Sequence, residues 1–143
     1  MNKITEEEII QFLKEETYED TITSETDIFN ECGISGDDCD EFLSKYSEIY
    51  SVDMSGFLWY FHYQEEGSLT LNLGRLFFKD PHQRVETIPV TPKMLTDFAN
   101  SKIWKIDYAE HKLPKYRYDM IINYIFFLII LIWLISSLIR KYF

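Results

Sequence analysis

The feature that most constrains the fold is an uninterrupted apolar stretch near the C-terminus. Residues 120–139 read MIINYIFFLIILIWLISSLI and contain no charged side chain. At about 1.5 Å per residue, a helix of this length reaches about 30 Å, which matches the hydrocarbon thickness of a bilayer. A buried core helix is the alternative, but no amphipathic face interrupts the run, and only Asn123, Ser136 and Ser137 are polar. The stretch therefore predicts a single membrane-spanning helix, with the lipid bilayer as its partner.

The N-terminal sequence favours one orientation of this span. Residues 1–20 are acidic and helical in pattern, and they lack the apolar stretch of a secretory signal. Basic residues on the two sides of the span differ by only one, so their distribution decides little. We therefore expect a tail-anchored, single-pass protein whose large N-terminal part stays in the cytoplasm, with a short tail at residues 141–143 beyond the membrane.

Charge divides the rest of the chain into two parts of opposite sign. Residues 1–66 carry 18 acidic and 3 basic side chains, whereas residues 67–118 carry 5 acidic and 9 basic ones. The negative field of the first part argues against nucleic acid or an anionic membrane surface as its partner. It favours a basic surface on a cytoplasmic or membrane protein. Solubility alone is the alternative explanation of the same charge.

The sequence contains none of the common catalytic or metal-binding patterns. Cys32 and Cys39 are the only cysteines, and their spacing is not that of a zinc-binding pair. His62, His82 and His111 are scattered along the chain. Glycine-rich phosphate loops, nucleophile elbows and calcium-binding loops are also absent. We expect reduced thiols, no metal and no catalytic residues, and hence a protein that is not an enzyme.

Periodicity and capping signals predict an all-α soluble domain. Thr5 and Glu8 form a capping box before the first helix, and Thr91 followed by Pro92 is typical of the start of the last one. The acidic stretch ISGDDCDEFL, residues 34–43, leads into a middle helix. The apolar stripe expected on this helix consists of Cys39, Phe42, Leu43, Tyr46, Ile49 and Tyr50.

The remaining segments complete the expected layout of the chain. Residues 57–63, FLWYFHY, predict a short helix packed into the core, in preference to an aromatic platform for stacking bases. Alternating leucines suggest a short extended segment near residues 69–88. We expect a soluble domain at residues 1–104, a linker at 105–118 and a transmembrane helix at 119–140.

This order of parts resembles that of acyl carrier proteins. More specifically, the chain is similar to an uncharacterised bacterial family of small acyl-carrier-like proteins, over most of residues 5–104. The similar stretches are TDIFNECGISGDDCDEFL, YSVDMSGFLWYF and IPVTPKMLTDFANSKIW. The resemblance implies an acyl-carrier-like small helical bundle and a bacterial origin, which would place the span in the inner membrane. It implies an architecture and not an activity.

Acyl carrier proteins attach phosphopantetheine to a serine in an Asp-Ser-Leu sequence at the start of their second helix. Aligning the apolar rhythm of residues 41–50 puts Ser35 on the aspartate position, Gly36 on the serine and Asp37 on the leucine. The attachment hydroxyl is therefore missing, unless a one-residue adjustment of the loop brings Ser35 into place. The alternative is that Ser35 only caps the helix, whose acidic first turn is favoured by the helix dipole.

Three functions follow from these observations. The leading one is a membrane-tethered adaptor without a cofactor. It docks a protein partner through the acidic patch, which we define as Asp37, Asp38, Asp40 and Glu41. The resemblance supports this surface, because carrier proteins present the same helix to basic regions of their enzymes. The second is a working carrier with phosphopantetheine on Ser35, and the third is a subunit or immunity-type component of a membrane protein complex. The oligomeric state stays open.

Overall fold

The described residues fold into four α-helices and three short 3₁₀ helices. This computed structural model describes residues 3–34, 36–65 and 73–142. The α-helices are α1 (Glu6–Thr17), α2 (Asp37–Tyr50), α3 (Pro92–Ser101) and α4 (Tyr118–Tyr142), and the 3₁₀ helices are η1 (Trp59–Phe61), η2 (Leu73–Leu76) and η3 (His82–Arg84). The described residues contain no strand, and only an isolated bridge joins Asp53 to Ile103. The prediction of an all-α domain followed by one long apolar helix is confirmed.

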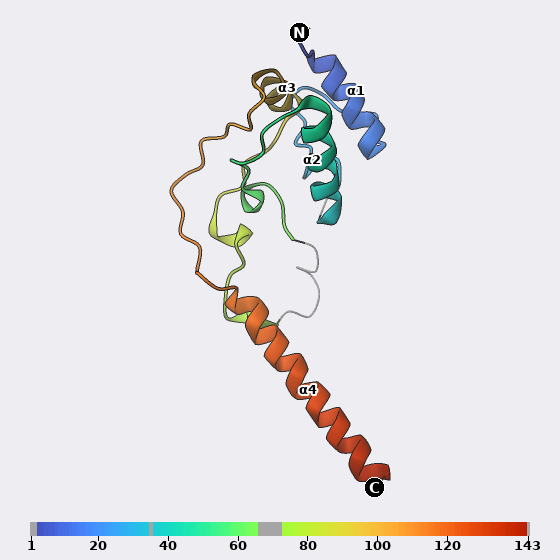
Figure 1. Ribbon diagram of the computed structural model, residues 1–143, viewed down its shortest axis with the longest axis vertical. Helices are drawn as coiled ribbons and strands as arrows, with labels where there is room; N and C mark the ends of the chain where they lie inside the picture. The colour runs from blue at the N-terminus through green and yellow to red at the C-terminus, as the bar shows by residue number, and fades with distance from the viewer. Residues whose placement is uncertain (1–2, 35, 66–72, 143) are drawn as a thin grey trace.

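Helix α4 stands apart from the other three helices. α1, α2 and α3 gather at one end of the molecule, and α4 extends away from them to the C-terminus (Figure 1). The helix is long and apolar enough to cross a membrane, and none of its apolar stretch is buried against the rest of the chain. Residues 102–117 connect α3 to α4 without a helix. The structure thus combines a compact helical bundle with one candidate membrane span.

Local capping explains where the helices begin. The Thr5 hydroxyl accepts a hydrogen bond from the Glu8 amide, and the Glu8 carboxylate accepts one from the Thr5 amide, so the predicted capping box is confirmed. Thr91 likewise caps α3, with Pro92 in the first turn. These two helix starts depend on neighbouring residues only, and for that reason they could be predicted from the sequence.

The start of α2 differs from the expected cap at Ser35. Gly36 is the residue that caps the helix, with a φ of 55°, and no side chain donates or accepts a capping hydrogen bond there. Ser35 itself lies outside the described residues. Glycine adopts a positive φ without the steric cost of a Cβ atom, so the chain can turn into the helix at this position. The helix therefore begins one residue later than a serine cap implies.

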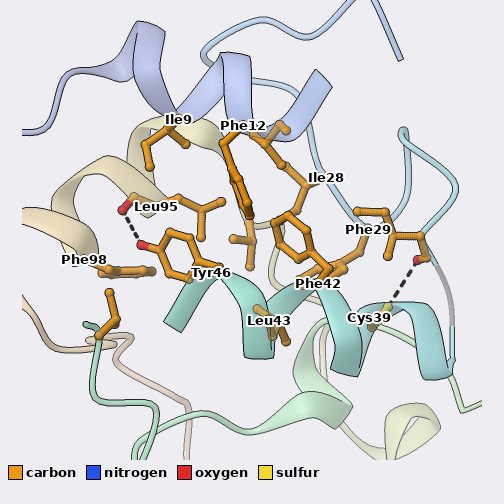
Figure 2. Close-up of a cluster of buried hydrophobic side chains, with 14 of the residues drawn as sticks. Ile9, Phe12, Ile28, Phe29, Cys39, Phe42, Leu43, Tyr46, Leu95 and Phe98 are labelled. Atoms are coloured by element: carbon orange, nitrogen blue, oxygen red, sulfur yellow. Dashed lines mark hydrogen bonds between the residues drawn. The ribbon is translucent and has the colours of Figure 1, made fainter. Parts of the chain in front are cut away.

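The core joins α1, α2 and α3 with the loop that precedes α2 (Figure 2). In the middle of α2, Tyr46 is buried and its hydroxyl donates a hydrogen bond to the carbonyl of Leu95 in α3. The prediction for Ile49 is wrong, since this side chain is 59% exposed. At that end of α2 it is Tyr50 whose ring packs against Phe12 of α1, at 5.6 Å between centroids. The apolar stripe thus turns away from Ile49 in the last turn of α2.

The aromatic segment forms a second part of the core. Residues 60–63 are all buried, and η1 is the short helix expected there. Trp104 is also buried, and its ring lies 5.0 Å from that of Phe57 and 4.7 Å from that of Phe98. The aromatic rings therefore connect η1 to α3 and to the chain that leaves it.

Two segments differ in the structure from what the sequence predicts. Residues 69–72 of the expected extended segment lie outside the described residues, and from Leu73 on the chain forms η2 and η3. The expected linker, residues 105–118, ends in α4, which already begins at Tyr118. It includes Tyr108, whose hydroxyl accepts hydrogen bonds from the Trp104 indole and from the amide of Leu58. The beginning of this segment is therefore in contact with the bundle.

Candidate functional site

The acidic patch occupies the first turns of α2. All four of its carboxylates are exposed, whereas Cys39, which lies among them in the sequence, faces the core. Residues three apart on a helix share a side, so Asp37 and Asp40 form one pair, and Asp38 and Glu41 form another. The structure places each pair in a different cleft. The patch is thus a ridge between two hollows.

The first cleft lies between the end of α1 and the start of α2 and encloses about 450 Å³. Asp38 and Glu41 line it from α2, and Glu15 and Glu16 line it from α1. Among the described residues that line it, the only cation is Lys45, whose ammonium lies 2.7 Å from the Glu16 carboxylate. The cleft therefore presents a surplus of negative charge.

The second cleft, of about 310 Å³, lies on the other side of α2 and includes Asp37 and Asp40. The Tyr63 hydroxyl donates a hydrogen bond of 2.8 Å to Asp40. Burial, together with this bond, raises the pKa of Tyr63 well above its ordinary value, so the phenol stays protonated as a donor. Met120 of α4 also lines the cleft, and the N-terminal end of α2 points toward the start of α4 (Figure 1). This cleft therefore reaches the first residues of the candidate span.

The carboxylates of the patch are not neutralised within the described part of the chain. None of the salt bridges there involves the acidic patch. The positive end of the helix dipole offsets part of the charge, as it does for any anion in a first helical turn. Because the four side chains also face solvent, a cationic surface could approach them without breaking a salt bridge of the described residues.

Neither cysteine near the patch has the properties of a reactive nucleophile. Cys39 is fully buried, and its thiol donates a hydrogen bond to the Ile34 carbonyl. Burial raises the pKa of the half-buried Cys32 thiol, and the neighbouring carboxylates of Glu19 and Glu31 raise it further. The thiolate is the reactive form, so Cys32 is a weak nucleophile at neutral pH.

The described residues do not fit a phosphopantetheine arm at the start of α2. The position that aligns with the attachment serine of carrier proteins is Gly36, which has no hydroxyl and is buried. Ser35 lies outside the described residues.

The three histidines, scattered in the sequence, come together around η1. His62 donates from Nδ1 to the Ile88 carbonyl, and its Nε2 accepts from the Tyr108 hydroxyl, because that oxygen already accepts the Trp104 indole N–H. The Tyr60 carbonyl accepts from His82, and the Tyr60 hydroxyl donates to His111. Burial lowers the pKa of His62, which is therefore a neutral structural side chain. Long-range contacts assemble this cluster, so no local signal in the sequence predicts it.

A second group of contacts, also missed from the sequence, holds the start of α4. The Arg117 guanidinium binds both oxygens of Glu65 and both oxygens of Asp119, at 2.8 to 3.1 Å. These bonds raise the pKa of Arg117 further above its ordinary value. Gly74 of η2 packs directly against the Asp119 backbone, where a Cβ atom would lie 1.8 Å from the carbonyl oxygen. The beginning of α4 is thus fastened to the rest of the chain from two sides.

Comparison with known proteins gives one result for this chain. A family described as "Protein of unknown function (DUF1493)" matches residues 1–107, which leaves α4 outside the match. No curated protein and no solved structure matches the chain. Since the match covers the whole helical bundle and most of the sequence, the chain belongs to the DUF1493 family of proteins of unknown function.

Proposed function

We propose that this protein is a membrane-tethered adaptor that docks a basic protein surface through the acidic patch. The observation that carries the proposal is the placement of the patch. Four exposed carboxylates crowd the N-terminal end of α2, flanked by two clefts, and none takes part in a salt bridge within the described residues. Complementary charge of this kind steers a partner and fixes its register. The protein acts as a binding module and not as an enzyme.

Tethering strengthens such a contact. α4 is long and apolar enough to cross a membrane. We propose that it confines the bundle to the bacterial inner membrane, with the bundle on the cytoplasmic side. Two proteins held in one bilayer meet at a raised effective concentration, so a weak electrostatic contact can suffice. The second cleft includes Met120 at the start of α4. The partner best suited to this geometry carries Lys and Arg residues close to its own membrane span.

Charge reversal tests the proposal with a matched control. The test variant is Asp38→Lys with Glu41→Lys in the full-length chain. The control, Glu48→Lys with Asp97→Lys, makes the same charge change at exposed sites elsewhere on α2 and on α3. The measurement is the amount of partner that co-purifies from native membranes with each variant. We expect the test variant to lose about tenfold or more, because like charges then face each other, and the control to retain its partner.

Two results would contradict the adaptor proposal. Equal recovery from the test variant and the wild type would show that the acidic patch does not dock anything. Equal loss in both variants would show that only the net charge matters. An increase in salt should also weaken recovery, since contacts between exposed charges are screened.

The proposal includes no prosthetic group, and the mass of the protein tests this separately. Full-length protein purified from its native host should have the mass of the unmodified chain. A phosphopantetheine-sized addition that disappears in a Ser35→Ala variant would instead make the protein a working carrier, which is the competing function.

A further inference from the structure

We propose that residues 73–79 are a second membrane contact, an interfacial foot that rests in the headgroup region of the bilayer beside α4. The proposal concerns how the bundle sits on the membrane, and it does not depend on the adaptor function. Its occupant is the lipid interface itself.

The foot exposes two large apolar side chains in succession. Leu76, the last residue of η2, is 76% exposed, and Phe77, which directly follows this 3₁₀ helix, is 72% exposed. The next residue, Phe78, turns inward, and its ring lies 5.5 Å from that of Tyr118. An exposed apolar pair of this size is unfavourable in water and favourable at the boundary between headgroups and acyl chains.

The foot lies at the level where the membrane begins. Gly74 touches the backbone of Asp119, and the charge-free stretch starts at the next residue, Met120. η2 lies beside the N-terminal end of α4 in the ribbon view (Figure 1). A 3₁₀ helix rises about 2 Å per residue, so Phe77 is within about 6 Å of that level. Interfacial segments bury their apolar side about 5–10 Å into the same region, so Phe77 is close enough to this level to reach it.

Two interactions hold the loop that carries Leu76 and Phe77 in place. Arg75 and Asp80 form an ion pair across the loop, and Asp80 also accepts a hydrogen bond from the Gln83 amide. The ion pair closes the loop on both sides of Leu76 and Phe77. The loop therefore presents both side chains from a fixed base.

The basic side chains in and around the foot suit an anionic bilayer. Lys79 is exposed at the end of the foot and Arg84 beyond it, and Lys112 and Lys115 are exposed on the chain that enters α4. Basic side chains near a membrane surface are attracted to acidic lipids over about a Debye length. Apolar side chains, basic neighbours and continuity with the span all favour lipid over a protein as the occupant.

Spin labelling measures the depth of the foot directly. Full-length protein with Cys32→Ser is labelled at Phe77→Cys and inserted into nanodiscs that contain anionic lipid, with one protein in each disc. Cys39 is fully buried and stays unlabelled. The readout is the collision rate of the label with oxygen, which enters the bilayer, against a nickel chelate, which stays in water. A label at Tyr18, which is 92% exposed directly after α1, serves as the water reference, and one at Phe127 of α4 serves as the membrane reference.

The proposal predicts an intermediate depth. The label at residue 77 should collide with the nickel chelate at least about threefold less often than the label at residue 18 does. It should also collide with oxygen less often than the label at residue 127 does. A second label, at Leu76→Cys, should give the same result. Nickel access equal to that at residue 18 at both positions would overturn the proposal. Protection that appears only when several copies share one vesicle would also overturn it, because a second copy would then cover the pair.

Discussion

Replacing Gly74 with alanine should separate η2 from α4. The added Cβ atom would lie 1.8 Å from the Asp119 carbonyl oxygen and 2.7 Å from its Cα, both of which belong to backbone that cannot rotate away. The two segments must therefore move apart by more than about 1 Å, and overpacking of this kind costs about 1–3 kcal/mol. An energy of that size raises the open population of the loop by about 5- to 150-fold.

Limited proteolysis measures this open population. Arg75 lies within η2, which packs on α4, so trypsin can cut after Arg75 when the loop leaves α4. The cutting rate follows the open fraction when opening is fast. We expect Gly74→Ala to be cut faster by the same factor of about 5 to 150. Gly56→Ala is the matched control, since its Cβ would lie 3.2 Å from the Trp104 carbonyl oxygen and needs only a small adjustment. Equal rates for Gly74→Ala and wild type would refute the packing of η2 on α4.

Three further predictions concern the bundle. Tyr46→Phe removes the hydrogen bond to the Leu95 carbonyl and should lower the free energy of unfolding by about 1 kcal/mol, measured by urea titration in micelles. Burial lowers the pKa of His62, so the unfolded chain binds its proton more readily, and stability should fall as the pH drops below 6.5. The same titration of His62→Asn should show a shallower pH dependence. The raised pKa of Cys32 predicts slower alkylation by iodoacetamide in the folded protein than in urea. Equal alkylation rates in the folded protein and in urea would contradict the prediction for Cys32.

The parts of the fold that depend on neighbouring residues could be predicted from the sequence. The caps of α1 and α3 need only residues three positions apart, and the apolar tail needs only its own composition. The acidic first turn of α2 is also local, so the acidic patch could be predicted as a set of residues. Its division between two clefts could not, because α1 supplies one wall and residues from η1 and α4 supply the other.

The parts that depend on distant contacts were missed for the same reason. Tyr108 joins His62 across 46 positions, and Gly74 meets Asp119 across a similar span. No periodicity connects such residues. At Ile49 the helical period was correct, but the last turn of α2 packs on α1 through Tyr50 instead. The cap at Gly36 could not be predicted either. Ser and Thr caps are recognised by their side chains, whereas Gly36 begins the helix through its positive φ.

The most direct test of the adaptor account is photo-crosslinking from the acidic patch in native membranes. A crosslinking amino acid placed at Asp37, which lines the cleft beside α4, samples whatever docks there. The same crosslinking amino acid placed at Asp97, which is exposed on α3 and lies outside the acidic patch, is the negative control. The account predicts one dominant protein adduct at position 37 that weakens with salt, and none at position 97. Adducts at position 97 but not at 37, or none at either, would contradict it.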